Sequence, residues 1–99
     1  MELLAYFFAG IFLANGIPHL INGICGRRFQ TPFAKPLGVG LSSPVVNVLW
    51  SAANIAAGVS LVAGVGNFNP RSLDLVLLGI GALLTAVILA IWFARVRAS

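Results

Sequence analysis

The spacing of the charged residues is the feature that most constrains how this chain can fold. Only 8% of its 99 residues are charged, and three long stretches carry no charge at all: 3–26, 36–70 and 75–94. A helix needs about 20 mostly apolar residues to cross the hydrocarbon core of a bilayer. We therefore predict an all-α fold, a bundle of three transmembrane helices. Their expected ranges are 3–25, 44–66 and 73–94, within a single membrane domain that covers 1–99.

Composition excludes the main alternatives to a membrane protein. Hydrophobic residues make up 60% of the chain and the mean hydropathy is +1.02, whereas soluble domains are about 45–50% apolar and about 25% charged. Disordered chains are poor in hydrophobic residues, so disorder is excluded too. The first apolar stretch follows Glu2 without a preceding Lys or Arg and has no small-residue cleavage site. We expect it to be a retained helix and not a signal peptide.

The basic residues predict the orientation in the membrane. Five of the six lie on one side of a three-span protein, namely Arg27, Arg28, Lys35, Arg95 and Arg97. The other side has Arg71 alone. Because cytoplasmic flanks carry the excess of Lys and Arg, we expect a protein of the cell (inner) membrane with its N-terminus outside and its C-terminus in the cytoplasm.

The loop 26–43 interleaves aromatic and basic residues. Phe29 and Phe33 alternate with the loop cluster, which we define as Arg27, Arg28 and Lys35. Such a mixture suits the headgroup layer. We expect the loop to lie along the membrane surface, with the loop cluster on anionic lipids. The alternative is an ordinary solvated loop.

Each of the first two spans carries one stripe of polar and small residues. The first stripe consists of Asn15, His19, Asn22 and Gly26, and the second consists of Asn47, Ser51, Asn54 and Gly58. The offsets within the two stripes are identical, and at about 100° per residue each stripe stays within about 60° of one helix face. Lipid offers no hydrogen bonds, so the stripes should face protein or a watery cavity.

Antiparallel neighbours place the two stripes at matching depths. Asn15 comes level with Asn54, Asn22 comes level with Asn47, and His19 comes beside Trp50 and Ser51. We therefore expect two layers of paired asparagines. The third span adds a small-residue edge, formed by Gly79, Ala82, Ala86 and Ala90, that permits close helix approach.

His19 is the one titratable side chain inside a predicted span. Ionisable residues within a membrane suggest a functional site, and the preceding Pro18 should kink the helix and free the carbonyl of Ala14. The alternative is a neutral histidine that only holds the bundle together. Both interpretations stay open at this point.

Two classes of function follow. One is an oligomeric solute or ion pathway, with Asn15, His19, Asn22, Asn47, Ser51 and Asn54 as candidate binding residues. The other is an accessory or structural subunit that docks a larger membrane complex, so the expected partners are lipids plus a homo-oligomer or such a complex. We predict no enzymatic activity, because no catalytic constellation is visible, and no cofactor. One His and one Cys cannot form a closed zinc site, and split basic residues do not indicate nucleic-acid binding.

Three segments carry a resemblance to known sequences. They are Asn15-Gly16-Ile17-Pro18-His19, Phe29-Gln30-Thr31-Pro32-Phe33-Ala34 and Ser43-Pro44-Val45-Val46-Asn47-Val48-Leu49-Trp50, with Gly23 and Gly26 between the first two. Here the chain resembles a group of short, uncharacterised bacterial integral membrane proteins with an N-G-x-P-H element and a T-P-F-A loop. The resemblance covers about the first sixty residues. It implies a three-helix membrane protein and no particular activity.

Overall fold

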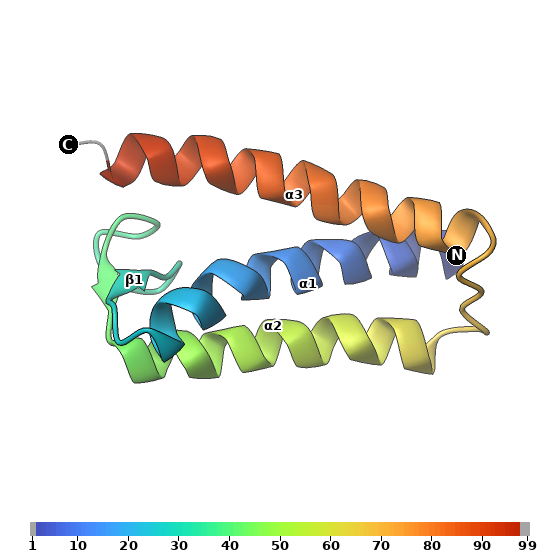
Figure 1. The fold of residues 1–99 in the computed structure, drawn as a ribbon, viewed down its shortest axis with the longest axis horizontal. Helices are drawn as coiled ribbons and strands as arrows, with labels where there is room; N and C mark the ends of the chain where they lie inside the picture. Colours follow the sequence, from blue (N-terminus) through green and yellow to red (C-terminus); the bar gives the residue numbers. More distant parts are fainter. Residues whose placement is uncertain (1, 98–99) are drawn as a thin grey trace.

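The computed structural model describes residues 2–97, which form three long helices and one small hairpin (Figure 1). The helices are α1 (Glu2–Ile24), α2 (Pro44–Gly64) and α3 (Leu73–Arg97). The hairpin pairs β1 (Phe29–Gln30) with β2 (Leu41–Ser42) in antiparallel register. All three helices are long and apolar enough to cross a membrane. The predicted three-helix architecture is therefore confirmed.

Local capping fixes where the second and third helices begin. Ser43 precedes Pro44, the first residue of α2, and its hydroxyl accepts a hydrogen bond from the Val46 N–H at 3.2 Å. Both features are favoured at a helix start. The Ser72 hydroxyl similarly accepts from the Asp74 N–H at 3.1 Å, so α3 starts behind Ser72. At its other end α3 continues through Arg97, past the predicted limit of 94.

The first helix lies between the other two and packs closely on both (Figure 1). A Cβ at Gly10 would collide with the backbone carbonyl of Leu78 on α3. On the other side, a Cβ at Gly58 of α2 would lie 2.6 Å from the Leu13 side chain. Glycine thus lets the backbones approach closely, as is common between membrane helices.

The small-residue edge of α3 differs in part from the prediction. A Cβ added at Gly79 would have no neighbour within 4 Å, whereas one at Gly81 would collide with the Phe7 carbonyl. Gly81 is also the buried residue of α3. The sequence pattern placed Gly79 at the contact with α1, but the glycine of α3 that contacts α1 is Gly81, because α3 packs with the face that carries Gly81.

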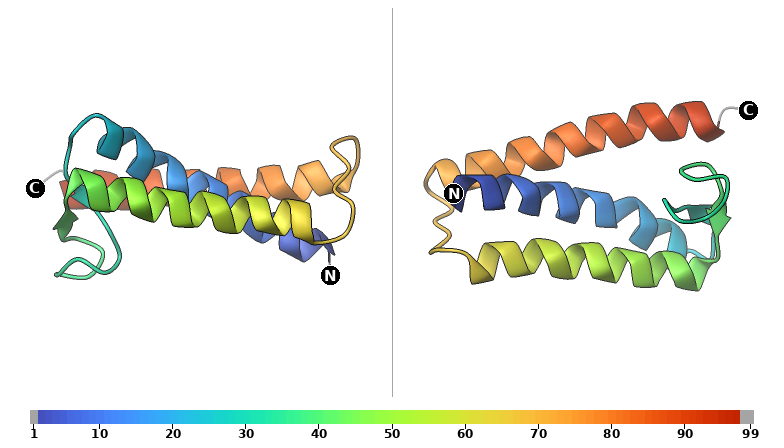
Figure 2. Two further views of the ribbon diagram at one scale, coloured as in Figure 1. Left: turned by 90° about the horizontal axis from the view of Figure 1, so that it is seen from below. Right: turned by 180° about the vertical axis from the view of Figure 1, so that it is seen from behind.

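The hairpin end of the bundle is the end that holds the loop 25–43 and the C-terminal half of α3. Here α3 stands apart from α2, and the hairpin lies between them (Figures 1 and 2). Phe29, Gln30 and Thr31 are at most 5% exposed. This part of the loop is therefore packed inside the bundle, and the position of the loop at the membrane surface stays a prediction. Its backbone and side chains find hydrogen-bond partners inside the bundle, and Phe29 packs against Phe93 with ring centroids 4.6 Å apart.

Candidate functional site

The layer nearer the middle of the bundle joins Asn15 and Asn54. The Asn15 amide nitrogen donates to Oδ1 of Asn54 at 2.9 Å. The amide nitrogen of Asn54 donates in turn to the Trp50 carbonyl, also at 2.9 Å. The predicted pairing of these two asparagines is confirmed. Asn54 is 5% exposed, so the bond is partly buried between α1 and α2.

The second layer joins His19 and Asn47, both buried. Nδ1 of His19 lies 2.8 Å from Oδ1 of Asn47. The amide nitrogen of Asn47 donates to three backbone carbonyls, those of Phe29, Ser42 and Ser43, at 3.1–3.2 Å. One side chain of α2 therefore holds α1 and both strands of the hairpin at once.

The predicted pairing of Asn22 with Asn47 is wrong. Asn22 donates to the Pro18 carbonyl of its own helix and accepts from Nε of Arg27 at 3.0 Å. The physical reason is that His19 and the hairpin carbonyls already use the whole amide of Asn47. Asn22 is left on the last turn of α1, beside the basic residues of the loop.

Ser51 is fully buried, yet its hydroxyl has no hydrogen-bond partner among the described residues. A Cβ at Gly16 would lie 3.3 Å from the Ser51 carbonyl, so this position serves close packing. His19 does lie beside Trp50, as predicted, with ring centroids 6.5 Å apart. Phe29 and Phe93 complete an aromatic surround of the imidazole at 5.5 and 6.5 Å.

The anchored amides of α2 determine which atoms of α1 stay uncommitted. Asn47 and Asn54 both turn their nitrogens to backbone carbonyls, so both present an oxygen to α1. Because an amide oxygen can only accept, Asn15 must donate through Nδ2 and His19 through Nδ1–H. Two acceptors of α1 are then left without a use in these bonds: Oδ1 of Asn15 and the Nε2 lone pair of a neutral His19. Neither has a hydrogen-bond partner among residues 2–97.

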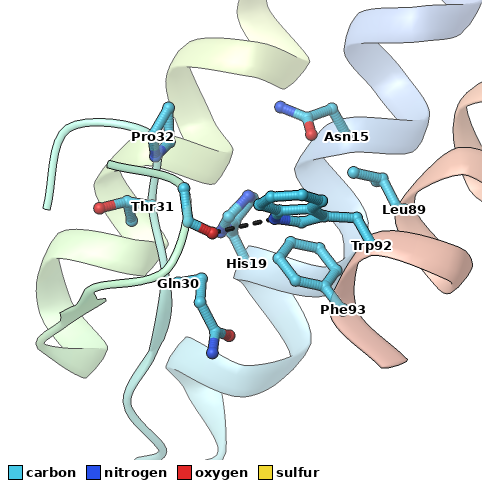
Figure 3. A pocket seen from close by; sticks show the side chains of 9 residues that line it. Asn15, His19, Gln30, Thr31, Pro32, Leu89, Trp92 and Phe93 are labelled. Atoms are coloured by element: carbon cyan, nitrogen blue, oxygen red, sulfur yellow. Dashed lines mark hydrogen bonds between the residues drawn. The ribbon is translucent and has the colours of Figure 1, made fainter. Parts of the chain in front are cut away.

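A cavity of about 260 Å³ lies beside these two residues. Its lining comes from α1, the hairpin and α3: Asn15, His19, Gln30, Thr31, Pro32, Gly38, Leu89, Trp92 and Phe93. Figure 3 shows the α3 side chains facing Asn15 and His19, with the hairpin residues on a third side. Trp92 donates its indole N–H to the Gly38 carbonyl at 2.9 Å and so joins α3 to the hairpin.

Sequence reasoning missed the hairpin and α3 part of this lining. Gln30, Thr31, Trp92 and Phe93 show no periodic polar signal in the sequence. The buried hydroxyl of Thr31 is bonded to the Ser42 hydroxyl at 2.6 Å. The Thr-Pro-Phe-Ala element, which carried the resemblance, was the one available hint that this loop has a specific structure.

An apolar groove of about 290 Å³ adjoins the cavity between α1 and α3. Leu89 and Phe93 line both spaces. The remaining lining consists of Ala14, Ile17, Pro18, Ala86 and Ala90. Ile17, Ala86 and Ala90 are exposed on the outer surface, so the groove opens onto the outer surface of the bundle.

The loop cluster stays outside the cavity, and its three residues are exposed. Of the basic residues of α3, Arg97 reaches inward: it donates to Oε1 of Gln30 at 3.3 Å and lies 5.2 Å from the centre of the Phe29 ring. Within residues 2–97 no group of three or more His, Cys, Asp or Glu side chains could hold a metal ion. The cavity thus offers hydrogen bonds and aromatic contacts.

Comparison of the chain with protein-family models, with curated proteins and with solved structures found no match.

Proposed function

We propose that this chain is a small multi-pass membrane protein that binds a small solute in the cavity beside His19 and passes it between the bilayer and the hairpin end. One observation carries the proposal: Asn15 and His19 of α1, which each carry a polar atom without a hydrogen-bond partner among the described residues, line a cavity of about 260 Å³. Polar groups that converge on a mostly apolar cavity are typical of small-molecule sites.

The proposed route uses only part of the polar stripe. Asn47, Ser51 and Asn54 are at most 5% exposed, and the two asparagines spend their amides on bonds within the chain. These residues hold the bundle together. The solute contacts Asn15 and His19, and the neighbouring groove gives it access from the lipid side.

Trp92 allows a direct test, because it lines the cavity. The variant Trp50→Phe leaves Trp92 as the one tryptophan and removes an indole N–H that has no partner among the described residues. In lipid nanodiscs, bromobenzene should quench Trp92 emission with a saturable dependence on concentration.

Two matched variants on α3 sharpen this test. Leu89 lines the cavity, whereas its neighbour Ile88 is 63% exposed toward lipid. Leu89→Phe should weaken saturable quenching about tenfold by overfilling the space, and Ile88→Phe should leave it unchanged. Quenching that rises linearly and equally in all three proteins would contradict the proposal.

The alternative function, a subunit that docks a larger membrane complex, needs a surface other than the polar stripe. The asparagines of the α2 stripe are buried within one chain and are not available to a second protein. A homo-oligomer or larger complex would add contacts outside the described bundle. The binding proposal itself requires one chain only.

The proposed setting is the inner membrane with the C-terminus in the cytoplasm. The fold supports this by bringing the loop cluster, Arg95 and Arg97 to one end of the bundle, with Arg71 at the other (Figure 1). The exposed loop cluster is then placed to contact anionic lipid headgroups.

A further inference from the structure

The cavity differs from a purely hydrophobic pocket because two of its lining residues carry hydrogen-bond acceptors that have no partner within the described residues. Oδ1 of Asn15 and Nε2 of His19 are both hydrogen-bond acceptors, and both belong to residues that line the cavity one helical turn apart. Of the donors in the lining, only the amide nitrogen of Gln30 has no hydrogen-bond partner among residues 2–97. The Trp92 N–H is bonded to Gly38, and the Thr31 hydroxyl is paired with Ser42. A ligand that satisfies these acceptors must therefore bring its own donors.

The proposed function is the premise for a more specific assignment. We infer that the solute is an uncharged amphiphile with a hydroxylated aromatic ring as its head and a single hydrocarbon tail. The ring lies in the cavity with its hydroxyl donating to Nε2 of His19 or Oδ1 of Asn15. The tail lies in the apolar groove between α1 and α3.

The positive charge at the cavity end disfavours a cationic head, and the two acceptors disfavour an anionic one. Glu2 and Asp74 are the chain's two acidic residues, and both lie at the opposite end of the bundle. At the cavity end Arg97 contacts Gln30 and the Phe29 ring. An ammonium head would meet this positive charge without a carboxylate to balance it. An anionic head would receive no hydrogen bond from Oδ1 of Asn15 or Nε2 of His19, because both atoms are acceptors.

The size and walls of the cavity fit one aromatic ring. A cavity of about 150 Å³ accommodates benzene, so about 260 Å³ accommodates a ring with a hydroxyl and small substituents. Trp92 and Phe93 supply ring faces and edges for offset or edge-to-face contacts. Figure 3 shows these two side chains directly across from His19 and Asn15.

The groove supplies the tail site because its lining has no polar side chain. It continues from the ring site, since Leu89 and Phe93 line both. Ala86 and Ala90 are small and leave room for a chain against α3. A hydrocarbon tail there would extend to the exposed side of the bundle, where it meets lipid chains.

The test compares three probes that share one tail: 4-octylphenol, its methyl ether and 4-octylbenzylamine. Each is used to displace bromobenzene from the Trp50→Phe protein in nanodiscs. The phenol should bind about tenfold tighter than the ether, because the ether lacks the donor and leaves buried acceptors unpaired. It should also bind more tightly than the cationic amine. These comparisons use a protein whose cavity residues are unaltered, so they do not depend on whether a cavity variant folds.

Variants then assign the head and the tail. Replacing both acceptors at once, with His19→Phe and Asn15→Leu, should bring the phenol-to-ether ratio down toward one, whereas Ser51→Ala, which removes a buried hydroxyl outside the lining, should keep it near ten. Ala86→Phe should remove the gain in affinity from a longer tail, and Ala52→Phe, on the exposed side of α2, should not.

Equal binding of phenol and ether would overturn the assigned head, and tighter binding of the amine would overturn the uncharged ligand. In both cases bromobenzene would still bind, so the proposed function would stand. Absence of saturable bromobenzene binding would refute the proposed function itself.

Discussion

Replacing Asn47 with leucine should be the most damaging polar-to-apolar change in the described stripe. The side chain is fully buried and makes four hydrogen bonds, to His19, Phe29, Ser42 and Ser43. Hydrogen bonds between membrane helices contribute about 0.6 kcal/mol on average and about 1.7 kcal/mol at most. Because the Asn47 amide nitrogen has two hydrogens to share among three carbonyls, the four contacts amount to about three average bonds, or about 1.8 kcal/mol, and the orphaned Nδ1–H of His19 raises the cost further.

Asn54→Leu is the matched comparison. Asn54 is also a buried asparagine of α2, but it makes two bonds, to Asn15 and Trp50. Its replacement should lower the free energy of unfolding by about 1.2 kcal/mol, less than the cost at Asn47. Unfolding would be measured in mixed micelles, where reversible conditions allow the two free energies to be compared.

Hydrogen exchange separates the two variants further. The hairpin includes the bond from the Thr31 N–H to the Gly40 carbonyl, and Asn47 is the side chain that anchors both strands. Asn47→Leu should speed exchange at Thr31, whereas Asn54→Leu should leave it unchanged. Equal destabilisation by the two variants, with unaltered exchange in the hairpin, would refute the idea that Asn47 organises the site.

Three further predictions concern the register, the orientation and the loop. Replacing both Asn15 and Asn54 with leucine should cost less than the sum of the single changes, because no amide is then orphaned; a double-mutant cycle of unfolding free energies that proves additive would contradict the bond. In a protein whose native Cys25 is serine, a cysteine placed at Asn67 should react with impermeant thiol reagents on intact cells and one at Lys35 should not; the reverse pattern would invert the topology. Neutralising the loop cluster with glutamine should weaken retention of anionic lipids during purification or disturb the topology, and unchanged retention with unchanged topology would make the loop an ordinary connector.

The sequence sufficed to predict the three helices and one polar layer because both depend on periodicity. Uncharged runs mark the spans, and equal offsets in antiparallel neighbours bring Asn15 to Asn54. The same rule failed at Asn22. Depth alone does not determine which of two candidates on α1, His19 or Asn22, takes the one oxygen of Asn47. That choice depends on the hairpin, whose carbonyls fix the orientation of the Asn47 amide.

The hairpin itself could not be predicted, because its structure comes from contacts distant in sequence. Phe29 and Gln30 are buried by α1 and α3, and the tip is joined to α3 by the Trp92–Gly38 bond. A short loop with prolines and glycines has no periodic pattern that would reveal such contacts. The cavity was missed for the same reason, since the hairpin and α3 form most of its wall.

The bonds that stabilise the bundle also determine the chemistry of its cavity. A pair of asparagines joined only to each other could flip together and present either an oxygen or a nitrogen to a ligand. Here Asn47 is anchored to the backbone carbonyls of Phe29, Ser42 and Ser43 and Asn54 to that of Trp50, which removes that freedom. His19 and Asn15 must then donate to α2, and their remaining atoms toward the cavity must be acceptors. Stability and ligand preference therefore rest on the same two side chains of α2, neither of which lines the cavity.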